Sequence, residues 1–237
     1  MFSESAELYD AIYGTFKDYA AEAKAIAALV RTAHPGARTV LDVGCGTGEH
    51  AKHLRASHGF AVDGLDLDPG LLAMARRKAQ DAQFFEADMS AFDLGRQYDV
   101  VACLFSSIGY LKTLSRVTQA LRCFRRHLVP GGIVIVEPWL TPDVMRAGAG
   151  STKRAETNGV RVERTSHTAI TGNISTLTFT YRIEDATGVR TAQEAHELGL
   201  FTPAEMLGCF REAGLAATHD AAGIFDNRGL YVARAIT

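Results

Sequence analysis

The chain has 237 residues, of which 47% are hydrophobic and 22% are charged, and its formal net charge is −2 at pH 7. This composition is typical of a soluble globular protein with one large domain, or with a domain that carries a sizeable insertion. The near-neutral charge gives no electrostatic footprint for nucleic acid or for an anionic membrane surface. No apolar run reaches membrane-spanning length.

The cysteines and the first residues indicate a reducing compartment. No C-x-x-C pair occurs, so the sequence predicts neither a disulfide framework nor a metal site. We expect buried free thiols. The first ten residues carry three acidic side chains and no apolar core of a secretory signal, and we therefore expect a cytoplasmic protein. The four cysteines are Cys45, Cys103, Cys123 and Cys209.

Residues 5–31 are predicted to form helices, because apolar side chains recur at helical spacing after Lys17. The same segment carries Tyr9, Tyr13 and Tyr19. We interpret Tyr13 as an aromatic residue that only packs. Tyr9 and Tyr19 could instead belong to a helical lid over a cofactor, although periodicity alone does not establish a lid.

A strand, a glycine turn and the start of a helix follow each other at residues 40–50. The apolar run at 40–43 suits a strand that is buried on both faces of a parallel sheet. Gly44, Gly46 and Gly48 allow a sharp turn and a close approach to a ligand. Asp42 lies at the strand end, where α/β sheets bind ligands.

The spacing of these glycines argues against two nucleotide-binding motifs. The dinucleotide fingerprint G-x-G-x-x-G requires a third glycine that is absent here, and the P-loop requires a Lys-Ser/Thr pair. The pattern D-x-G-x-G-x-G instead resembles the S-adenosylmethionine loop of class I methyltransferases. The adjacent Glu49 suits a cofactor with a sulfonium and an ammonium group. The alternative is an ordinary strand-to-helix turn.

Strands and helices alternate up to residue 139, which predicts an α/β fold with a doubly wound, mostly parallel sheet. The helices are expected at residues 49–57, 71–80 and 114–127, and the strands at 38–43, 60–67, 83–87, 98–105 and 133–136.

Polar residues follow several of these strands. Asp66 lies eighteen residues after the last loop glycine, where an acid accepts hydrogen bonds from ribose hydroxyls. Asp68 is expected to cap the next helix. Asp88 could accept from an adenine amino group or cap the following turn. Ser106 and Ser107 form a small polar run suited to substrate contact.

The pattern changes after residue 140. Strands are expected at 161–167, 174–184 and 189–200 without helices between them, with hairpin turns at 171–173 and 185–188. We therefore divide the chain into a cofactor-binding α/β domain at 1–140 and 201–237, and an inserted antiparallel sheet at 141–200. The insertion could cover the substrate or form a dimer surface. A helix at 202–213 and a strand at 231–234 end the chain.

Beyond the glycine loop, the chain resembles the TDP-aminosugar N-methyltransferases of antibiotic deoxysugar pathways, which belong to the class I methyltransferases. The runs F-S-S-I-G and V-E-P-W are the most specific similarities. The similar stretches run in order along the chain, at residues 7–10, 17–19, 41–48, 87–89, 105–109, 136–139, 164–167, 200–202 and 228–230.

The resemblance implies transfer of a methyl group from S-adenosylmethionine to a sugar amine, with dimethylation expected and S-adenosylhomocysteine as the product. It also implies a nucleotide-sugar substrate, and we expect a homodimer. The expected cofactor-binding residues are Tyr9, Asp42, Gly44, Cys45, Gly46, Gly48, Asp66, Leu67, Asp88, Met89 and Leu104. The expected substrate-binding residues are Tyr19, Ser106, Ser107, Glu137, Trp139, Arg164, Ser166, His167 and Arg228.

The chain departs from the family pattern at Tyr110, where relatives carry histidine, and at Leu140, where they carry a second tryptophan. Methyl transfer to a neutral amine mainly requires alignment of amine, methyl and sulfur. Tyr110 and Glu137 could orient the amine or accept its proton through water. Tyr110 cannot replace an imidazole base near pH 7, since the reference pKa of tyrosine is about 10. His167 titrates near neutrality and is the third candidate.

Three other functions fit parts of the sequence. A methyltransferase for another small molecule would keep the loop and need no arginines for a diphosphate. A non-catalytic cofactor-binding partner would use the inserted sheet as its interaction surface. A dehydrogenase is disfavoured by the missing third glycine.

Overall fold

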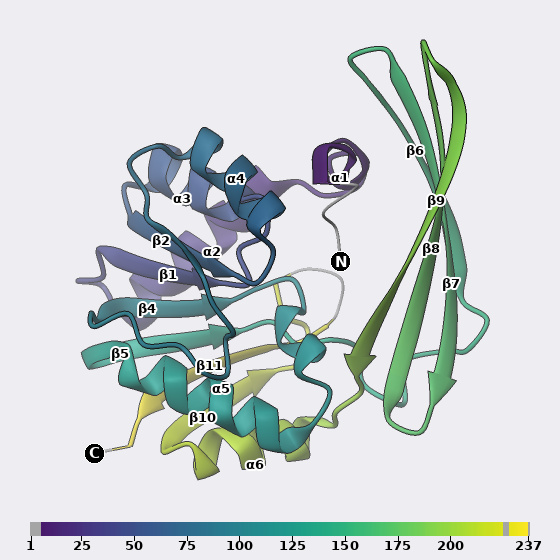
Figure 1. Ribbon diagram of the computed structural model, residues 1–237. Helices are drawn as coiled ribbons and strands as arrows, with labels where there is room; N and C mark the ends of the chain where they lie inside the picture. The colour runs from purple at the N-terminus through teal and green to yellow at the C-terminus, as the bar shows by residue number, and fades with distance from the viewer. Residues whose placement is uncertain (1–5, 225–227, 237) are drawn as a thin grey trace.

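Two β-sheets organise the chain (Figure 1). The computed structural model describes residues 6–224 and 228–236. Sheet A contains β1 (Thr39–Val43), β2 (Ala61–Asp66), β3 (Phe84–Glu86), β4 (Tyr98–Cys103), β5 (Leu128–Val136), β10 (Leu215–Asp220) and β11 (Leu230–Ala235). Its order is β10-β11-β5-β4-β1-β2-β3, in which β1 to β5 pair in parallel and the pairs β5–β11 and β10–β11 are antiparallel.

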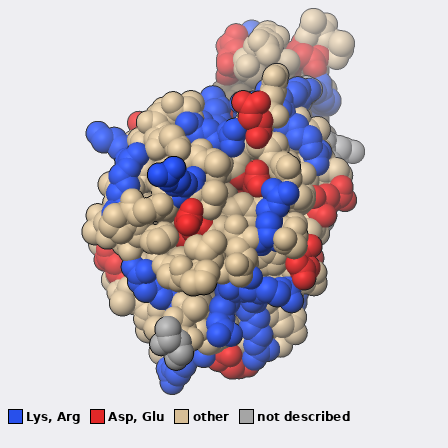
Figure 2. Space-filling view, turned by 90° about the vertical axis from the view of Figure 1, so that its left-hand side faces the viewer, with Lys and Arg blue, Asp and Glu red and all other residues tan. Residues whose placement is uncertain are grey.

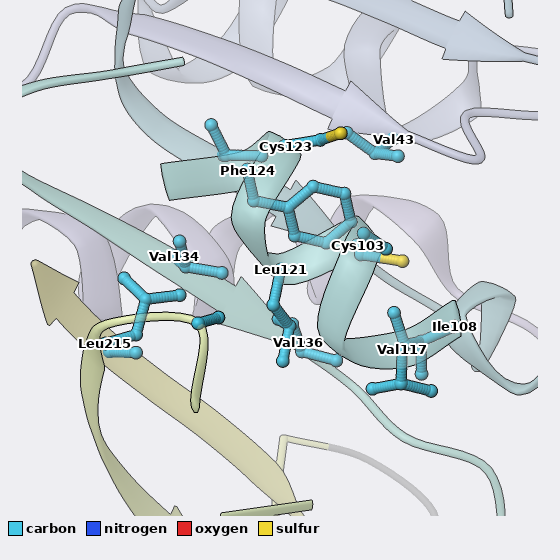
Figure 3. Close-up of a cluster of buried hydrophobic side chains, with 14 of the residues drawn as sticks. Val43, Cys103, Ile108, Val117, Leu121, Cys123, Phe124, Val134, Val136 and Leu215 are labelled. Atoms are coloured by element: carbon cyan, nitrogen blue, oxygen red, sulfur yellow. The ribbon is translucent and has the colours of Figure 1, made fainter. Parts of the chain in front are cut away.

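Helices cover both faces of sheet A (Figure 1). One face carries α2 (Tyr19–Ala33), α3 (Glu49–His58) and α4 (Pro69–Lys78), and the other carries α5 (Leu114–Arg126) and α6 (Pro203–Glu212). Figure 3 shows how Leu121 and Phe124 of α5 lie against Val134 and Val136 of β5. Because both faces are covered, the central strands are continuous apolar runs, as in other buried parallel sheets.

Side chains at the helix starts fix where these helices begin. Asp68 accepts hydrogen bonds from the amides of Gly70 and Leu71, so it caps α4 as predicted. Thr202 and Glu205 form a reciprocal capping box at α6. These caps satisfy amides that have no partner within a helix.

The strand order reverses between β1 and β4, and this reversal opens a crevice at their carboxyl ends. The glycine loop (residues 44–48) follows β1, and the 3-10 helix η2 (Ser107–Leu111) comes soon after β4. Gly44 has φ +73°, and a Cβ there would lie 2.6 Å from the Cβ of Ser107. Only glycine therefore allows the two segments to approach this closely.

Sheet B is the inserted antiparallel sheet, with β6 (Gly150–Thr157), β7 (Val160–Thr171), β8 (Ile174–Asp185) and β9 (Gly188–Gly199). Its inner face packs on α1 (Ala6–Tyr13), which lies between sheet B and the α/β layers in Figure 1. Leu8 and Ile12 of α1 join a small core there with Phe179 and Tyr181. The side chains of the opposite, outer face are mostly exposed, and Glu197 near one end of this face pairs with Lys112.

The predicted α/β class and the antiparallel insertion are confirmed. The sequence interpretation was wrong where it left out β6, β10 and η2, and where it started the strand expected at 133–136 too late, because β5 begins at Leu128. β6 is an exposed edge strand without an apolar face, and β10 carries mostly short or polar side chains. Neither strand shows the alternation that identifies strands in a sequence.

The surface of the described chain matches its low net charge. Positive and negative residues are interspersed over the face in Figure 2. None of the helices in residues 6–224 and 228–236 is long and apolar enough to cross a membrane.

Candidate functional site

A cavity lies at the carboxyl ends of β1 and β4, lined by the glycine loop, the N-terminal segment and the segment after β4. Its wall brings together five of the predicted cofactor residues with Tyr19 and Ser107, which were predicted for substrate. Thr47, Glu49, His50 and Phe105 complete the wall, and none of them was among the predicted site residues. The five cofactor residues are Tyr9, Gly44, Cys45, Gly46 and Leu104.

Two acidic side chains support the glycine loop. Asp66 accepts hydrogen bonds from the amides of Gly46 at 2.8 Å and Asp68 at 3.0 Å. Asp42 is 1% exposed, and its Oδ2 has no hydrogen-bond partner within the described chain. Burial raises the pKa of Asp66, and it raises the pKa of Asp42 to about 6. In their ionised forms these two carboxylates place negative charge beneath the loop, which suits a cationic ligand, and such a ligand would in turn favour their ionisation.

The N-terminal segment is fastened to this loop by polar contacts. Thr47 donates a hydrogen bond to Asp10 of α1 at 2.6 Å. Lys78 of α4 bridges Asp10 and Glu49, with its Nζ 2.8 Å from the Glu49 carboxylate. The predicted lid position of this segment thus has a physical basis in contacts to the glycine loop.

A buried ionic cluster lies behind Tyr19. Glu22 of α2 lies 2.8 Å from Lys17 Nζ and 2.8 Å from His50 Nε2. Burial raises the pKa of Glu22, but the hydrogen bonds and charges of His50 and Lys17 outweigh it and hold the pKa below its ordinary value. Lys17 Nζ also lies 3.4 Å from the centre of the Phe105 ring. Sequence spacing could not have revealed this cluster, because its members come from separate elements.

The segment after β4 has an unusual backbone. Phe105 and Ser106 have φ values of 49° and 67°, which residues with side chains rarely adopt. Glu137 accepts the Phe105 amide at 2.6 Å, and Ser106 donates to the Pro138 carbonyl at 2.7 Å. Burial raises the pKa of Glu137, and the nearby Arg228 opposes that rise. Such strain persists only where neighbouring contacts hold it, and it is common at functional sites.

Arg228 and Trp139 extend the site away from the cavity. The Arg228 guanidinium donates to Ser106 Oγ at 3.1 Å and lies 4.7 Å from the Phe105 ring centre and 5.6 Å from that of Trp139. Trp139 donates its indole N–H to Ser175 of sheet B at 2.9 Å. These contacts connect sheet B to the strained segment.

Arg164 is a buried cation on the inner face of sheet B. It is 5% exposed, and its guanidinium lies 4.9 Å from the Tyr13 ring centre and 4.3 Å from that of Phe179. Its Nε and Nη1 have no hydrogen-bond partner within the described chain. A buried charge with unmet donors is costly, so the position suits a bound anion.

Other predicted residues lie apart from the cavity wall. His167 is exposed on the outer face of β7, whereas Arg164 is on the inner face. Asp88 accepts from Ser90 and from Arg116 at 2.6 Å. Leu67 is 50% exposed. The roles of these residues stay predictions.

Three further predicted residues have clear local contacts. Gly48 faces α4, where a Cβ would lie 2.9 Å from the Cβ of Ala75. The terminal methyl of Met89 would lie 3.6 Å from a Cβ at Gly44, so Met89 adjoins the glycine loop. Ser166 hydrogen-bonds with Ser151 of β6. Gly48 is thus the last residue of the glycine loop, Met89 adjoins that loop, and Ser166 lies apart from it.

Tyr110 lies on η2, with its hydroxyl 3.0 Å from Nδ1 of His196 of β9. Sequence reasoning singled out Tyr110 but not His196. The two are 86 residues apart, and no spacing rule relates an inserted sheet to a loop of the α/β core.

The chain is similar in sequence to known methyltransferases. Residues 40–132 match the family model described as a methyltransferase domain. The chain is 40% identical over 231 residues to dTDP-3-amino-3,4,6-trideoxy-alpha-D-glucopyranose N,N-dimethyltransferase of Streptomyces venezuelae, covering 97% of each. It is also 40% identical to dTDP-3-amino-3,6-dideoxy-alpha-D-glucopyranose N,N-dimethyltransferase of Streptomyces fradiae, covering 96% of this chain and 89% of the relative.

Solved structures agree with these relatives. The structure of DesVI from Streptomyces venezuelae has a TM-score of 0.91 and 39% identity, covering 97% of this chain and 98% of its own. The amino pentose methyltransferase CalS10 from Micromonospora echinaspora, solved with S-adenosylmethionine bound, has a TM-score of 0.85 and 33% identity, covering 95% of each chain.

The raised pKa of Asp42 predicts a pH-dependent stability difference. This carboxyl stabilises the folded state below its unfolded pKa of about 3.8, and that contribution is lost as the pH rises through its folded pKa of about 6. Asp42→Asn removes the titration. Relative to wild type, the variant should therefore gain about 2–3 kcal/mol in free energy of unfolding between pH 4 and pH 8. Urea unfolding of both proteins across this range measures the difference, and a pH-independent difference would contradict the assignment.

Proposed function

The chain belongs to the dTDP-aminosugar N,N-dimethyltransferases, a family of class I S-adenosylmethionine-dependent methyltransferases, and on this basis we propose that it dimethylates the amine of a dTDP-linked amino-deoxysugar in antibiotic biosynthesis. The observation that carries the proposal is 40% identity across 97% of both chains. The cavity behind an intact glycine loop supports it.

The residues at the cavity fit the cofactor. The glycine loop leaves room for close backbone approach, and Asp42 offers a buried oxygen without a partner in the described chain. When bound, S-adenosylmethionine supplies an electrophilic methyl group on a sulfonium. Tyr9, Tyr19 and the N-terminal segment close one wall and would keep water away from it. We assign the ribose to Asp66, whose carboxylate already anchors the loop.

The chain's own residues must then align a sugar amine with that methyl group. The strained segment after β4 borders the cavity through Leu104, Phe105 and Ser107. Glu137 and Arg228 hold this segment in place. Rigid placement of the two reactants is a proximity effect that lowers the barrier to methyl transfer.

We assign the nucleotide diphosphate to Arg164, together with Arg228. The planar guanidinium fork matches phosphate oxygens, and Arg164 has two donors that no described residue accepts. The Tyr13 ring connects Arg164 to the cavity, since its centre lies 4.2 Å from that of the cavity residue Tyr9. An anion on the inner face of sheet B would therefore lie next to the cofactor.

We further propose that residues 141–200 form a substrate cover through the inner face of sheet B and a homodimer surface through its outer face. The outer face supports this second role because it is broad, mostly exposed and carries threonines such as Thr165, Thr178 and Thr180. We also assign the protein to the cytoplasm, which its free, buried cysteines support.

Mass spectrometry tests the reaction. Incubation with S-adenosylmethionine and dTDP-aminosugars aminated at C3 or C4 should add two methyl masses to one of the sugars, through a monomethyl intermediate. Since the enzyme mainly aligns its reactants, only one amine position should react well. Normal cofactor binding without any methylated sugar would refute the substrate class.

Arg164→Met should raise the KM for the dTDP-aminosugar about 10–100-fold, because it removes a charged hydrogen bond worth about 1.5–3 kcal/mol. The dissociation constant for S-adenosylmethionine should stay the same. Arg161→Met is the matched control, since Arg161 lies on the same strand, is 68% exposed and pairs with Glu156 and Glu184. Equal effects of both variants would argue against the diphosphate assignment.

The oligomeric state tests the dimer surface. Sedimentation equilibrium should give about twice the chain mass of 25.6 kDa. Thr180→Arg on the outer face should shift the protein toward the monomer, because it buries an unpaired charge at the contact. A monomeric wild-type protein would exclude the proposed surface.

A further inference from the structure

A chain of polar side chains connects Tyr110 to the interior of sheet B. The Tyr110 hydroxyl lies 3.0 Å from Nδ1 of His196, and Nε2 of His196 lies 3.4 Å from Oε1 of Glu194. The hydroxyl of Tyr181 donates to the same carboxylate oxygen. The imidazole is 4% exposed, so it reaches solvent mainly through Tyr110 and these partners.

The outer end of this chain lies near the cavity. Tyr110 is 40% exposed. It is three residues beyond Ser107, which lines the cavity. A negative charge on Tyr110 would raise the pKa of Tyr9, a residue of the cavity wall.

Packing fixes the distance between the two elements that carry the chain. Gly109 of η2 lies against Leu198 of β9, and a Cβ at Gly109 would be 3.1 Å from a methyl carbon of Leu198. The His196 ring meets the Phe179 ring at a centroid distance of 5.2 Å. The hydrogen bond between Tyr110 and His196 is therefore built into a close contact between η2 and sheet B.

The surroundings set the protonation states. Desolvation raises the pKa of Tyr110, so the phenol is neutral and can donate. Burial raises the pKa of Glu194, but hydrogen bonds from His196 and Tyr181 outweigh it and keep the pKa low, so Glu194 is a carboxylate. Tyr110 would therefore donate to Nδ1 of His196, and Nε2 of His196 faces the Glu194 carboxylate at 3.4 Å.

We propose that Tyr110, His196 and Glu194 form a proton relay that takes the proton from the ammonium form of the aminosugar. This inference rests on the proposed function. The substrate N–H proton passes to Tyr110 Oη as the Tyr110 proton passes to His196 Nδ1, which leaves an imidazolium paired with the Glu194 carboxylate. Tyr110 is neutral before and after the step, so its high pKa does not prevent these proton transfers.

The freed amine lone pair then forms the new N–CH₃ bond, and the electrons of the broken S–CH₃ bond stay on sulfur. His196 returns its proton to water by the reverse path through the exposed edge of Tyr110. The monomethylated product is again an ammonium, so the relay would operate once for each methyl group. Tyr110 would touch the substrate, whereas His196 and Glu194 act through it as positioning residues.

Other titratable and charged groups near the relay come from every neighbouring element. They bear on the pH dependence, because each can shift the imidazole's affinity for a proton. They are Tyr9 and Tyr13 of α1, Asp66 of β2, Arg164 of β7 and Tyr181 of β8.

The pH dependence of kcat/KM for the dTDP-aminosugar separates a relay from a purely structural role. Tyr110→Phe and His196→Gln should each lower kcat/KM about 100-fold near pH 6.5, because general acid–base steps contribute about 10²–10⁴-fold. The loss should shrink to about threefold or less near pH 9.5, where more of the amine is neutral in solution. The double variant should be no slower than the slower single variant, as for groups that act as one unit.

Glu197→Gln is the matched control, because Glu197 lies on β9 with its side chain on the outer face, where it pairs with the exposed Lys112. It should leave the profile unchanged. Calorimetric titration with S-adenosylmethionine confirms that each variant folds. Tyr110→Phe conserves volume at a partly exposed position, so it tests the relay even if a buried His196 variant fails to fold.

A loss that is equal at all pH values, or no loss at any pH, would overturn the relay while wild-type methylation still stands. A wild-type protein that binds the cofactor but methylates no dTDP-aminosugar would instead remove the proposed function, and the relay with it.

Discussion

The close approach of the glycine loop to the segment after β4 is the constraint on which the site depends. Gly44 has no side chain, and any Cβ there would meet Ser107 at 2.6 Å. This contact brings together the ends of β1 and β4, where the strand order reverses and a crevice must open. The cavity wall, the N-terminal segment and the strained segment all adjoin it.

Charge is divided between the two sides of this crevice. Asp42 and Asp66 lie beneath the glycine loop on the α/β side, where we propose that the sulfonium cofactor binds. Arg164 lies buried on the inner face of sheet B, where we propose that the nucleotide diphosphate binds. The N-terminal segment reaches both sides, because Asp10 contacts Thr47 and the Tyr13 ring packs on Arg164. An ordered N-terminal segment therefore completes both halves of the site.

Sheet B supplies a histidine beside residue 110, the position at which this chain departs from the family pattern. The family resemblance leads one to expect an imidazole there, and the chain carries a phenol. The structure places a second imidazole, His196, within hydrogen-bond distance of that phenol. Tyrosine alone would be a poor proton acceptor near neutral pH. In the proposed relay the phenol contacts the substrate, and the imidazole behind it, next to Glu194, accepts the proton.

The sequence alone determined the α/β class, the antiparallel insertion and the glycine loop, because burial and turn geometry leave local patterns in the residues. It also identified Tyr9, Asp42, Asp66 and Arg164 as candidates. Only the tertiary structure decided which side chains meet: it joined Lys17 to Glu22 and His50, paired Tyr110 with His196, and placed His167 on the far face from Arg164. Contacts between distant elements depend on how sheets and loops pack, and no local periodicity encodes that packing.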